Sequence, residues 1–438
     1  MNEDQQTYQN LIAKMNHQVL VTQDNRVTIL RKILVDLHYP DQSYKIIHIA
    51  GTNGKGSSGA MLGAILQENG YHVGRFSSPA MLDDREQIKL DGQMISYKAF
   101  LQAYQFISDT LGNRDQVASL SIFEWFTLIA LVAFKQAKVD FVILEVGLGG
   151  KNDATNAISA PLLTLFTHID YDHTQILGHT IRKIATQKSG IIKSGSSVIV
   201  APHQKQITRE VLRTVADKHH VAIHFVRNIQ LKVLNQDQTG TQVQISGPLI
   251  TKQVYQLGLI GNFQLDNLAT VLSAVTWLRQ NGTSLDQQCV YKALSQLKVP
   301  GRMQIIQQHP TVILDGAHNP DGAKQLVQSL KSLFPNRKIH FLLGFLADKN
   351  YFEMLKSYLP IATNVYVNTP SQHQRALDKY RLATVIRNEF HFANDHLFET
   401  NDSHEALAQA RQRSSTNDVI IITGSFYFIK QFEGEFHV

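Results

Sequence analysis

The chain has 438 residues, 43% of them hydrophobic and 18% charged, which is enough apolar material for two or three folded domains and excludes a mostly disordered chain. Its 42 Lys and Arg residues against 36 Asp and Glu residues give a net charge of +6, and they are scattered, so we expect anionic small ligands and no nucleic-acid partner. Cys289 is the single cysteine, which excludes an intrachain disulfide and a cysteine-based metal cluster.

The sequence shows no targeting or membrane signal. Residues 1–9 are polar and lack the basic-then-apolar layout of a signal peptide. The longest apolar run, residues 126–134, is shorter than the ~18 to 20 apolar residues of a membrane-spanning helix. We therefore expect a cytoplasmic protein without a membrane partner.

The first 220 residues alternate short apolar runs with segments of helix length. The apolar runs are typical of parallel strands that are covered on both faces. This alternation predicts an α/β fold with a mainly parallel sheet and helices on both sides. Strands are expected at residues 44–50, 141–146, 162–169 and 198–201, and helices at 57–69, 97–110, 122–136 and 207–218.

The pattern changes twice along the rest of the chain. Residues 221–254 alternate in polarity and carry turn signals near 239 and 247, which predicts a small antiparallel sheet, followed by a helix at 267–279. A turn-like segment near residue 299 then precedes a second βα alternation, so we expect domains at 1–298 and 299–438, the second a smaller, Rossmann-like α/β domain. Its strands are expected at 311–314, 339–344, 364–368 and 419–423, and its helices at 320–333, 352–358 and 377–390.

A glycine-rich loop, Gly51-Thr52-Asn53-Gly54-Lys55-Gly56-Ser57, joins the first strand to the helix after it. Glycines let the backbone approach a phosphate, and the N–H groups of the loop and helix start can then face the anion. Lys55 would add a positive charge at the outer phosphates, and the Ser57 hydroxyl suits Mg²⁺. The sequence differs from the strict P-loop motif, so an ordinary glycine-rich turn remains the alternative. The position of the loop between a strand and a helix favours nucleoside triphosphate binding.

This loop resembles the ATP loop of the Mur ligase superfamily, and of its folylpolyglutamate synthase/dihydrofolate synthase branch in particular. Other blocks resemble the same family and follow its order along the chain, which is difficult to explain by chance. They are residues 144–156 (beginning Leu-Glu-Val-Gly-Leu-Gly-Gly), 172–178 (beginning Asp-His-Thr), 188–193, 300–302 (Pro-Gly-Arg), 315–320 (Asp-Gly-Ala-His-Asn-Pro) and 423–425 (Thr-Gly-Ser).

The resemblance implies an enzyme, an ATP-dependent acid–amino-acid ligase. Such a ligase joins L-glutamate to a carboxylate of a folate, here a tetrahydrofolate polyglutamate, with dihydropteroate as a further substrate that the sequence leaves open. The carboxylate attacks the γ-phosphate of ATP to give an acyl phosphate and ADP, and the glutamate amine then displaces phosphate. The family's usual state is a monomer.

The resemblance also assigns roles to single residues. Catalytic roles fall to Glu145, His173, Lys188 and His318, and Lys188 is expected to be carbamylated. Two Mg²⁺ ions are expected, with Ser57, Ser78, Glu145 and His173 as ligands. ATP is expected to contact Thr52, Asn53, Gly54, Lys55, Gly56, Ser57, Asn267 on the adenine side, Arg302 at the phosphates and Asp315 at the ribose.

The sequence departs from the family at several positions. Where the family has Pro-His-Leu and then Glu-Arg-Ile, this chain has Pro79-Ala80-Met81 and residues 86–88 read Glu-Gln-Ile. Phe263 replaces a histidine, and Gln304 replaces a glutamate. Residues 79–90 help to hold the pterin in the family, so these changes leave the preferred folate open.

Three other functions are alternatives. A peptidoglycan-precursor amino-acid ligase normally has a domain before its ATP loop, which here begins at Gly51. A P-loop kinase or GTPase would favour a strict Walker spelling and a single domain. A binding protein without turnover would not need the full set of Glu145, His173, Lys188, Arg302 and Asp315.

Overall fold

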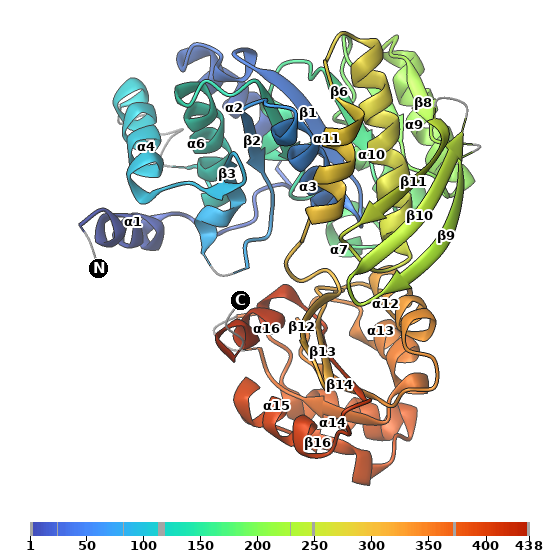
Figure 1. The fold of residues 1–438 in the computed structure, drawn as a ribbon. Coiled ribbons are helices and arrows are strands. Elements are labelled where there is room, and N and C mark those ends of the chain that lie inside the picture. The colour runs from blue at the N-terminus through green and yellow to red at the C-terminus, as the bar shows by residue number, and fades with distance from the viewer. Residues whose placement is uncertain are drawn as a thin grey trace. The chain divides into compact units, whose positions relative to one another are not determined.

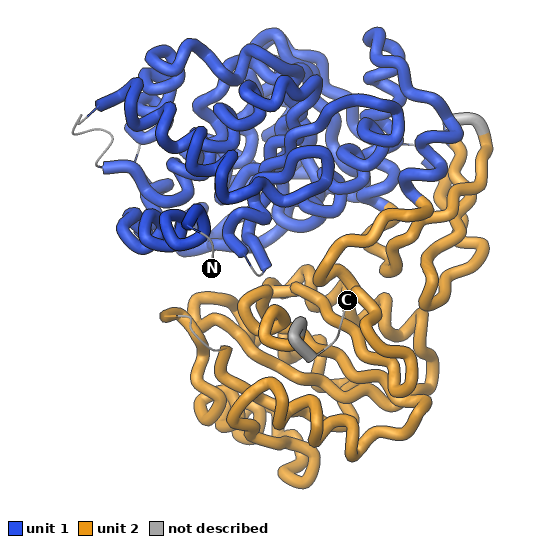
Figure 2. Tube along the Cα trace, turned by 60° about the vertical axis from the view of Figure 1, so that its left-hand side comes forward, with its two compact units in different colours: residues 1–229, 247–250, 266–294 blue, residues 230–246, 251–265, 295–438 orange. Residues whose placement is uncertain are grey.

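The computed structural model describes residues 3–23, 25–81, 83–112, 119–227, 229–247, 250–370 and 374–435. The chain divides into two compact units, shown in Figure 2. Unit 1 comprises residues 1–229, 247–250 and 266–294, and unit 2 comprises residues 230–246, 251–265 and 295–438. The domain boundary near residue 299 stays a prediction; in this division residues 230–246 and 251–265 belong to unit 2.

Unit 1 is built on an eight-stranded sheet with the order β4-β3-β2-β5-β1-β6-β7-β8. Figure 1 labels β1, β2, β3, β6 and β8 of this sheet. The six strands from β2 to β8 in that order are parallel, and β3 and β4 add an antiparallel edge. This arrangement confirms the predicted, mainly parallel α/β fold. The strands are β1 (Lys45–Ala50), β2 (Val73–Phe76), β3 (Ile88–Leu90), β4 (Gln93–Met94), β5 (Phe141–Glu145), β6 (Leu163–Phe166), β7 (Ser197–Val200) and β8 (Ile223–Phe225).

Helices cover both faces of this sheet. Helix α3 (Lys55–Glu68) packs on one face, where a methyl group at Gly59 would lie 3.3 Å from Ile143 of β5. Helix α6 (Ile122–Gln136) packs on the other face, where Phe134 leaves no room for a side chain at Gly74. The remaining helices are α1 (Glu3–Lys14), α2 (Arg26–Asp36), η1 (Pro40–Gln42), η2 (Asp84–Gln87), α4 (Tyr97–Leu111), η3 (Ala154–Ala157), α7 (Thr174–Leu177), α8 (Ile181–Ser189), α9 (Gln206–Lys218), α10 (Phe263–Gln280) and α11 (Gln287–Gln296).

The predicted small antiparallel sheet is present, but its predicted extent is wrong at the N-terminal side. Strands β9 (Gln230–Asp237), β10 (Gly240–Gly247) and β11 (Ile250–Leu257) form a three-stranded sheet in which β9 and β10 pair antiparallel. Strand β8 instead pairs parallel with β7, because α9 forms a crossover that returns the chain to the large sheet. Residues 248 and 249 of the second predicted turn lie outside the described residues.

Unit 2 contains a six-stranded sheet with the order β12-β13-β17-β14-β15-β16. Strand β12 is antiparallel to β13, and the other neighbours are parallel, which confirms the predicted second α/β fold. The strands are β12 (Gln304–Gln308), β13 (Thr311–Leu314), β14 (Ile339–Leu343), β15 (Asn364–Val367), β16 (Leu397–Glu399) and β17 (Val419–Thr423). The helices are α12 (Pro320–Leu333), α13 (Tyr351–Tyr358), η4 (Leu359–Ile361), α14 (Lys379–Phe390), η5 (Asn394–His396), α15 (Ser403–Gln412), α16 (Phe426–Ile429) and η6 (Lys430–Glu435). In the ranges described above, no helix has the length and apolar character needed to cross a membrane.

Candidate active site

The candidate residues of unit 1 follow the carboxyl ends of neighbouring parallel strands. Ile49 of β1 pairs with Glu145 of β5, and Ala50 pairs with Phe166 of β6. The loops that follow these strands therefore emerge at one edge of the sheet. Open α/β sheets bind their ligands at this edge.

The glycine-rich loop has its shape because two of its positions exclude a side chain. A Cβ at Gly51 would lie 1.9 Å from Oγ1 of Thr167, which follows β6. Gly54 has φ +94°, and a Cβ there would lie 2.2 Å from Oδ1 of Asn267 on α10. The structure thus places Asn267 directly against the loop.

Backbone hydrogen bonds fix the first part of the loop. The N–H groups of Thr52 and Asn53 both donate to the carbonyl oxygen of His168, at 2.7 and 3.2 Å. A phosphate would therefore be met by the N–H groups in the first turn of α3, which begins at Lys55. A helix leaves these N–H groups without intrahelical partners.

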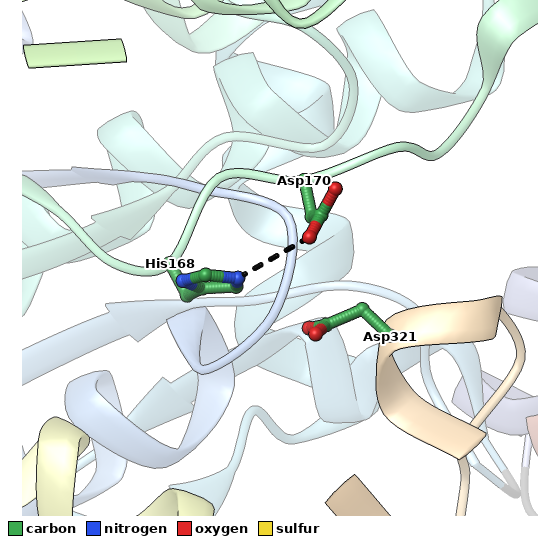
Figure 3. Close-up of side chains that lie close together, drawn as sticks. All are labelled: His168, Asp170 and Asp321. Atoms are coloured by element: carbon green, nitrogen blue, oxygen red, sulfur yellow. Dashed lines mark ion pairs between the residues drawn. The ribbon is translucent and has the colours of Figure 1, made fainter. Parts of the chain in front are cut away.

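The loop is also tied to the segment after β6 through Asp170. The Thr52 hydroxyl donates to the Asp170 carbonyl oxygen at 2.9 Å and accepts from the Asp170 N–H at 3.1 Å. The Asp170 carboxylate accepts from Lys205 at 2.5 Å and lies 3.6 Å from His168 Nε2, the pair that Figure 3 shows. Burial alone would raise the pKa of Asp170, but hydrogen bonds from His168 and Lys205 outweigh burial and lower the pKa to about 2.

Lys55 and Glu145 meet at the start of α3. The Lys55 ammonium donates to the carbonyl oxygens of Gly51 and Thr52, both at 3.2 Å, and lies 4.0 Å from Oε1 of Glu145. Only 6% of Glu145 is exposed, and a Cβ at Gly56 would lie 3.6 Å from its Oε2. A buried carboxylate thus faces the helix start at which a phosphate would bind.

Lys188 lies on the other side of the same loop. It comes from the last turn of α8, is 5% exposed, and its ammonium donates to the Gly51 carbonyl oxygen at 2.8 Å. The loop after Glu145 packs closely on this helix end, because a Cβ at Gly150 would lie 2.7 Å from the Lys188 carbonyl oxygen. The carbonyl oxygen of Gly51 therefore accepts hydrogen bonds from both predicted lysines, Lys55 and Lys188.

The predicted magnesium ligands come from four segments at this edge. Ser57 is buried in the first turn of α3, and Ser78 follows β2, the strand next to β5. His173 has φ +48° and immediately precedes α7, with its Nε2 3.8 Å from Asp172. The carboxylate and hydroxyl oxygens of this set fit Mg²⁺, which prefers hard oxygen ligands.

The predicted residues of unit 2 lie at the carboxyl edge of its own sheet. Asp315 follows β13, is buried, and accepts from the N–H groups of Met303 and Ala317 at 3.0 and 2.9 Å. Burial raises the pKa of Asp315, and the charge of Arg302 opposes that rise. The Arg302 guanidinium lies 4.6 Å from the ring centroid of Phe426, and the His318 ring lies 6.1 Å from the same centroid. The structure thus groups Arg302, Asp315 and His318 around the end of β13.

Sequence reasoning missed two features of the unit 1 edge. The Lys205–Asp170–Thr52 connection joins residues up to 153 positions apart and leaves no local pattern in the sequence. Arg75 lies in β2, a strand that was not predicted, since it has only four residues and contains a glycine and the arginine itself. An arginine inside an otherwise apolar segment was the available signal.

The sequence matches two protein-family models over most of its length. The model described as "Mur ligase middle domain" matches residues 49–275, and that described as "Mur ligase, glutamate ligase domain" matches residues 301–426. A dihydrofolate synthase/folylpolyglutamate synthase of Bacillus subtilis is 33% identical over 408 residues, which cover 91% of this chain and 92% of the relative.

Solved structures give the same relationship. A Mycobacterium tuberculosis folylpolyglutamate synthase complexed with ADP matches with a TM-score of 0.87 and 28% identity, covering 99% of this chain and 98% of that one. A bifunctional folylpolyglutamate synthase/dihydrofolate synthase of Yersinia pestis, complexed with AMPPNP and a Mn ion, matches with a TM-score of 0.80 and 29% identity, covering 93% of each chain. With Lys55, Glu145 and Lys188 gathered at one loop of this fold, the chain belongs to the folylpolyglutamate synthase/dihydrofolate synthase family of Mur ligases.

Proposed function

We propose that this protein is an ATP-dependent ligase that forms an amide bond between L-glutamate and a carboxylate of a tetrahydrofolate, releasing ADP and phosphate. The observation that carries the proposal is the convergence of the Lys55 and Lys188 ammonium groups and the Glu145 carboxylate at the Gly51 loop. The similar structures complexed with ADP or with AMPPNP support an ATP-using site.

The reaction must bring anions together, and the chain supplies the opposing charge. The carboxylate of the folate attacks the γ-phosphate, so two negatively charged groups approach each other. Lys55 lies beside the helix start that would hold the phosphates, and its flexible stem lets its ammonium move from the Gly51 and Thr52 carbonyls to the γ-phosphate. Glu145 and Lys188 are both buried and contact Lys55 and the Gly51 carbonyl oxygen, respectively.

The metal and the modified lysine belong to the proposal. We propose that Ser57, Ser78, Glu145 and His173 hold two Mg²⁺ ions, which when bound neutralise phosphate charge and orient the attacking carboxylate. We propose that Lys188 carries a carbamate. This modification would replace the positive ammonium group beside the Gly51 loop by a negatively charged group.

Roles for further residues follow the same line. We propose that Thr52, Asn53, Gly54, Gly56 and Asn267 contribute to the ATP site of unit 1. In unit 2 we propose that Arg302 contacts phosphate, Asp315 contacts ribose and His318 takes part in the reaction. We also propose that the protein is a monomer, that it is cytoplasmic, and that its domain boundary lies near residue 299.

ADP release measures this function directly. We expect release to require L-glutamate and tetrahydrofolate together, and dihydropteroate in place of tetrahydrofolate tests whether the protein is bifunctional. Release that depends on a muramyl precursor would instead indicate a peptidoglycan-type ligase. Release without any of these acceptors would indicate a kinase-like or hydrolytic function.

A further inference from the structure

Arg75 projects from the middle of β2 toward the α3 face of the sheet. Its neighbours in the strand, Gly74 and Phe76, belong to the opposite face, since Gly74 abuts Phe134 of α6 and Phe76 lies in the core that α6 helps to form. Side chains alternate along a strand, so Arg75 faces the other way. Arg75 also pairs in register with Ile143, which faces α3.

A second cation lies directly opposite Arg75. Lys89 of β3 pairs with Arg75 in the antiparallel register. Like charges at directly opposed positions destabilise a sheet, and both side chains are half-buried. Burial lowers the pKa of both groups, and the charge of Arg75 lowers the pKa of Lys89 further.

The carboxylates of this neighbourhood are committed elsewhere. Glu145 interacts favourably with Arg75 but faces Lys55 and the start of α3. Glu86, the carboxylate that favours the charged form of Lys89, accepts hydrogen bonds from the N–H groups of Met81 and Asp83.

Arg75 itself has donor capacity to spare. Its Nη2 reaches the Ser77 hydroxyl at 3.4 Å, whereas its Nε is buried without a hydrogen-bond partner. A buried guanidinium N–H without a hydrogen-bond partner lowers the stability of the fold. The presence of such a group in this chain points to an acceptor that binds to it.

We propose that Arg75 and Lys89 form a binding site for the α-carboxylate of the glutamate residue whose γ-carboxylate is activated. This inference rests on the proposed function and names the class of acceptor: folates that end in a glutamate residue with free α- and γ-carboxylates. Dihydropteroate, whose reactive carboxylate has no neighbouring carboxylate, would make no use of this site. Arg75 and Lys89 are therefore residues that determine specificity.

The spacing within the sheet agrees with one glutamate unit. Arg75 lies one strand from β5 and two residues before the level of Glu145, which separates their Cα atoms by about 8 Å for ordinary strand spacing and rise. The two carboxyl carbons of a glutamate are at most about 5 Å apart. An arginine side chain readily spans the difference, so an α-carboxylate can meet Arg75 while the γ-carboxylate lies near Glu145.

The test compares tetrahydrofolate with its α-carboxamide analogue, which keeps the shape and the reactive γ-carboxylate but loses the α charge. We expect wild-type protein to show a KM about 10- to 100-fold higher for the amide, as for a lost charge-assisted hydrogen bond. Arg75→Gln should raise the KM for tetrahydrofolate by a similar factor and should no longer distinguish acid from amide. Lys89→Gln should reduce the distinction as well, and Arg75→Lys should retain part of it.

The control is Arg213→Gln, which removes an exposed arginine on α9 and should keep the wild-type preference. The proposal is overturned if wild-type protein uses acid and amide within twofold of each other. It is also overturned if Arg75→Gln lowers kcat for both substrates and keeps the preference, since Arg75 would then act only through Glu145. The wild-type comparison and Lys89→Gln decide the matter even if Arg75→Gln does not fold. A wild-type protein that releases no ADP with tetrahydrofolate and L-glutamate refutes the proposed function itself, which is a separate outcome.

Discussion

Replacing Gly51 with alanine would place a methyl group inside the side chain of Thr167. The new Cβ would lie 1.9 Å from Oγ1, 3.0 Å from Cβ and 3.2 Å from the carbonyl carbon of Thr167, whereas carbon contacts prefer about 3.5 to 4.0 Å. Rotation of the Thr167 side chain cannot relieve the second and third contacts, because they involve its Cβ and carbonyl carbon, which rotation does not move. The backbone of the loop would therefore have to move.

The expected cost follows from that geometry. Overpacking a buried position costs about 1 to 3 kcal/mol, so the variant should fold with a moderately lower melting temperature. The larger effect should be on ATP use, because the Gly51 carbonyl oxygen accepts hydrogen bonds from Lys55 and Lys188. A displacement of about 1 Å at such a position can cost about 100-fold in rate, so we expect kcat/KM for ATP in the ADP-release assay to fall by about that factor.

Two further variants make the Gly51→Ala prediction specific. Thr167→Ala removes the 1.9 Å contact, so the double variant should recover about tenfold in kcat/KM relative to Gly51→Ala. Gly63→Ala is the control, because a Cβ at Gly63 in α3 would meet no atom within 4 Å, and it should keep wild-type activity with equal or higher stability. A Gly51→Ala protein with kcat/KM for ATP within twofold of wild type would refute the reasoning. So would a double variant whose loss in kcat/KM equals the combined losses of the two single variants.

Three other predictions concern charged groups of the same edge. Lys188→Ala should abolish ADP release, and added short carboxylic acids should restore part of the release if a carbamate is required. The carbamate would be contradicted if no acid restored release and mass spectrometry showed an unmodified Lys188 in the wild-type protein. Glu145→Gln should lower kcat by about 100- to 1,000-fold without lowering the melting temperature, because it removes a buried charge. The control is Glu68→Gln, at the partly exposed last residue of α3. Because the pKa of Asp170 is lowered to about 2, its pairing with Lys205 stabilises the fold above about pH 4 and is lost as the pH falls toward 2. Lys205→Gln should therefore cost about 1 kcal/mol near pH 6, measured by denaturant unfolding, and the difference from wild type should vanish near pH 2; a difference independent of pH would contradict the assignment.

The strands at the centre of both sheets could be predicted because they are short apolar runs covered on both faces. Strand β1, for example, is buried from its second residue to its end, and the prediction at residues 44–50 differs from Lys45–Ala50 by one residue. Strands β4, β12 and β16 at sheet edges, and β3 next to an edge, were not predicted, since peripheral strands mix polar and apolar residues and depend on their neighbours. Helices α1 and α2 were also missed. For α1 the reason is related, since it buries only one residue and its sequence is mostly polar.

The sequence could predict that the Gly51 loop and Glu145 lie at one edge of the sheet, but not the contacts around them. The loop at Gly51 and the carboxylate at the end of β5 follow from local sequence, and parallel strands must bring them to one edge. The bond from Lys188 to Gly51 spans 137 residues, and the like-charge pair of Arg75 and Lys89 depends on the register of β2 with β3. Such contacts are set by the fold as a whole, and no spacing in the sequence specifies them.

The central claim, that the folate carboxylate is activated by phosphoryl transfer at the Gly51 loop, can be tested by following one oxygen atom. Tetrahydrofolate labelled with ¹⁸O in its γ-carboxyl group is incubated with ATP, L-glutamate and the protein, and the phosphate released is analysed by mass spectrometry. The acyl phosphate route predicts one ¹⁸O atom in each phosphate, because the oxygen that attacks the γ-phosphate leaves with it. Phosphate without ¹⁸O, formed together with the amide product, would contradict the account.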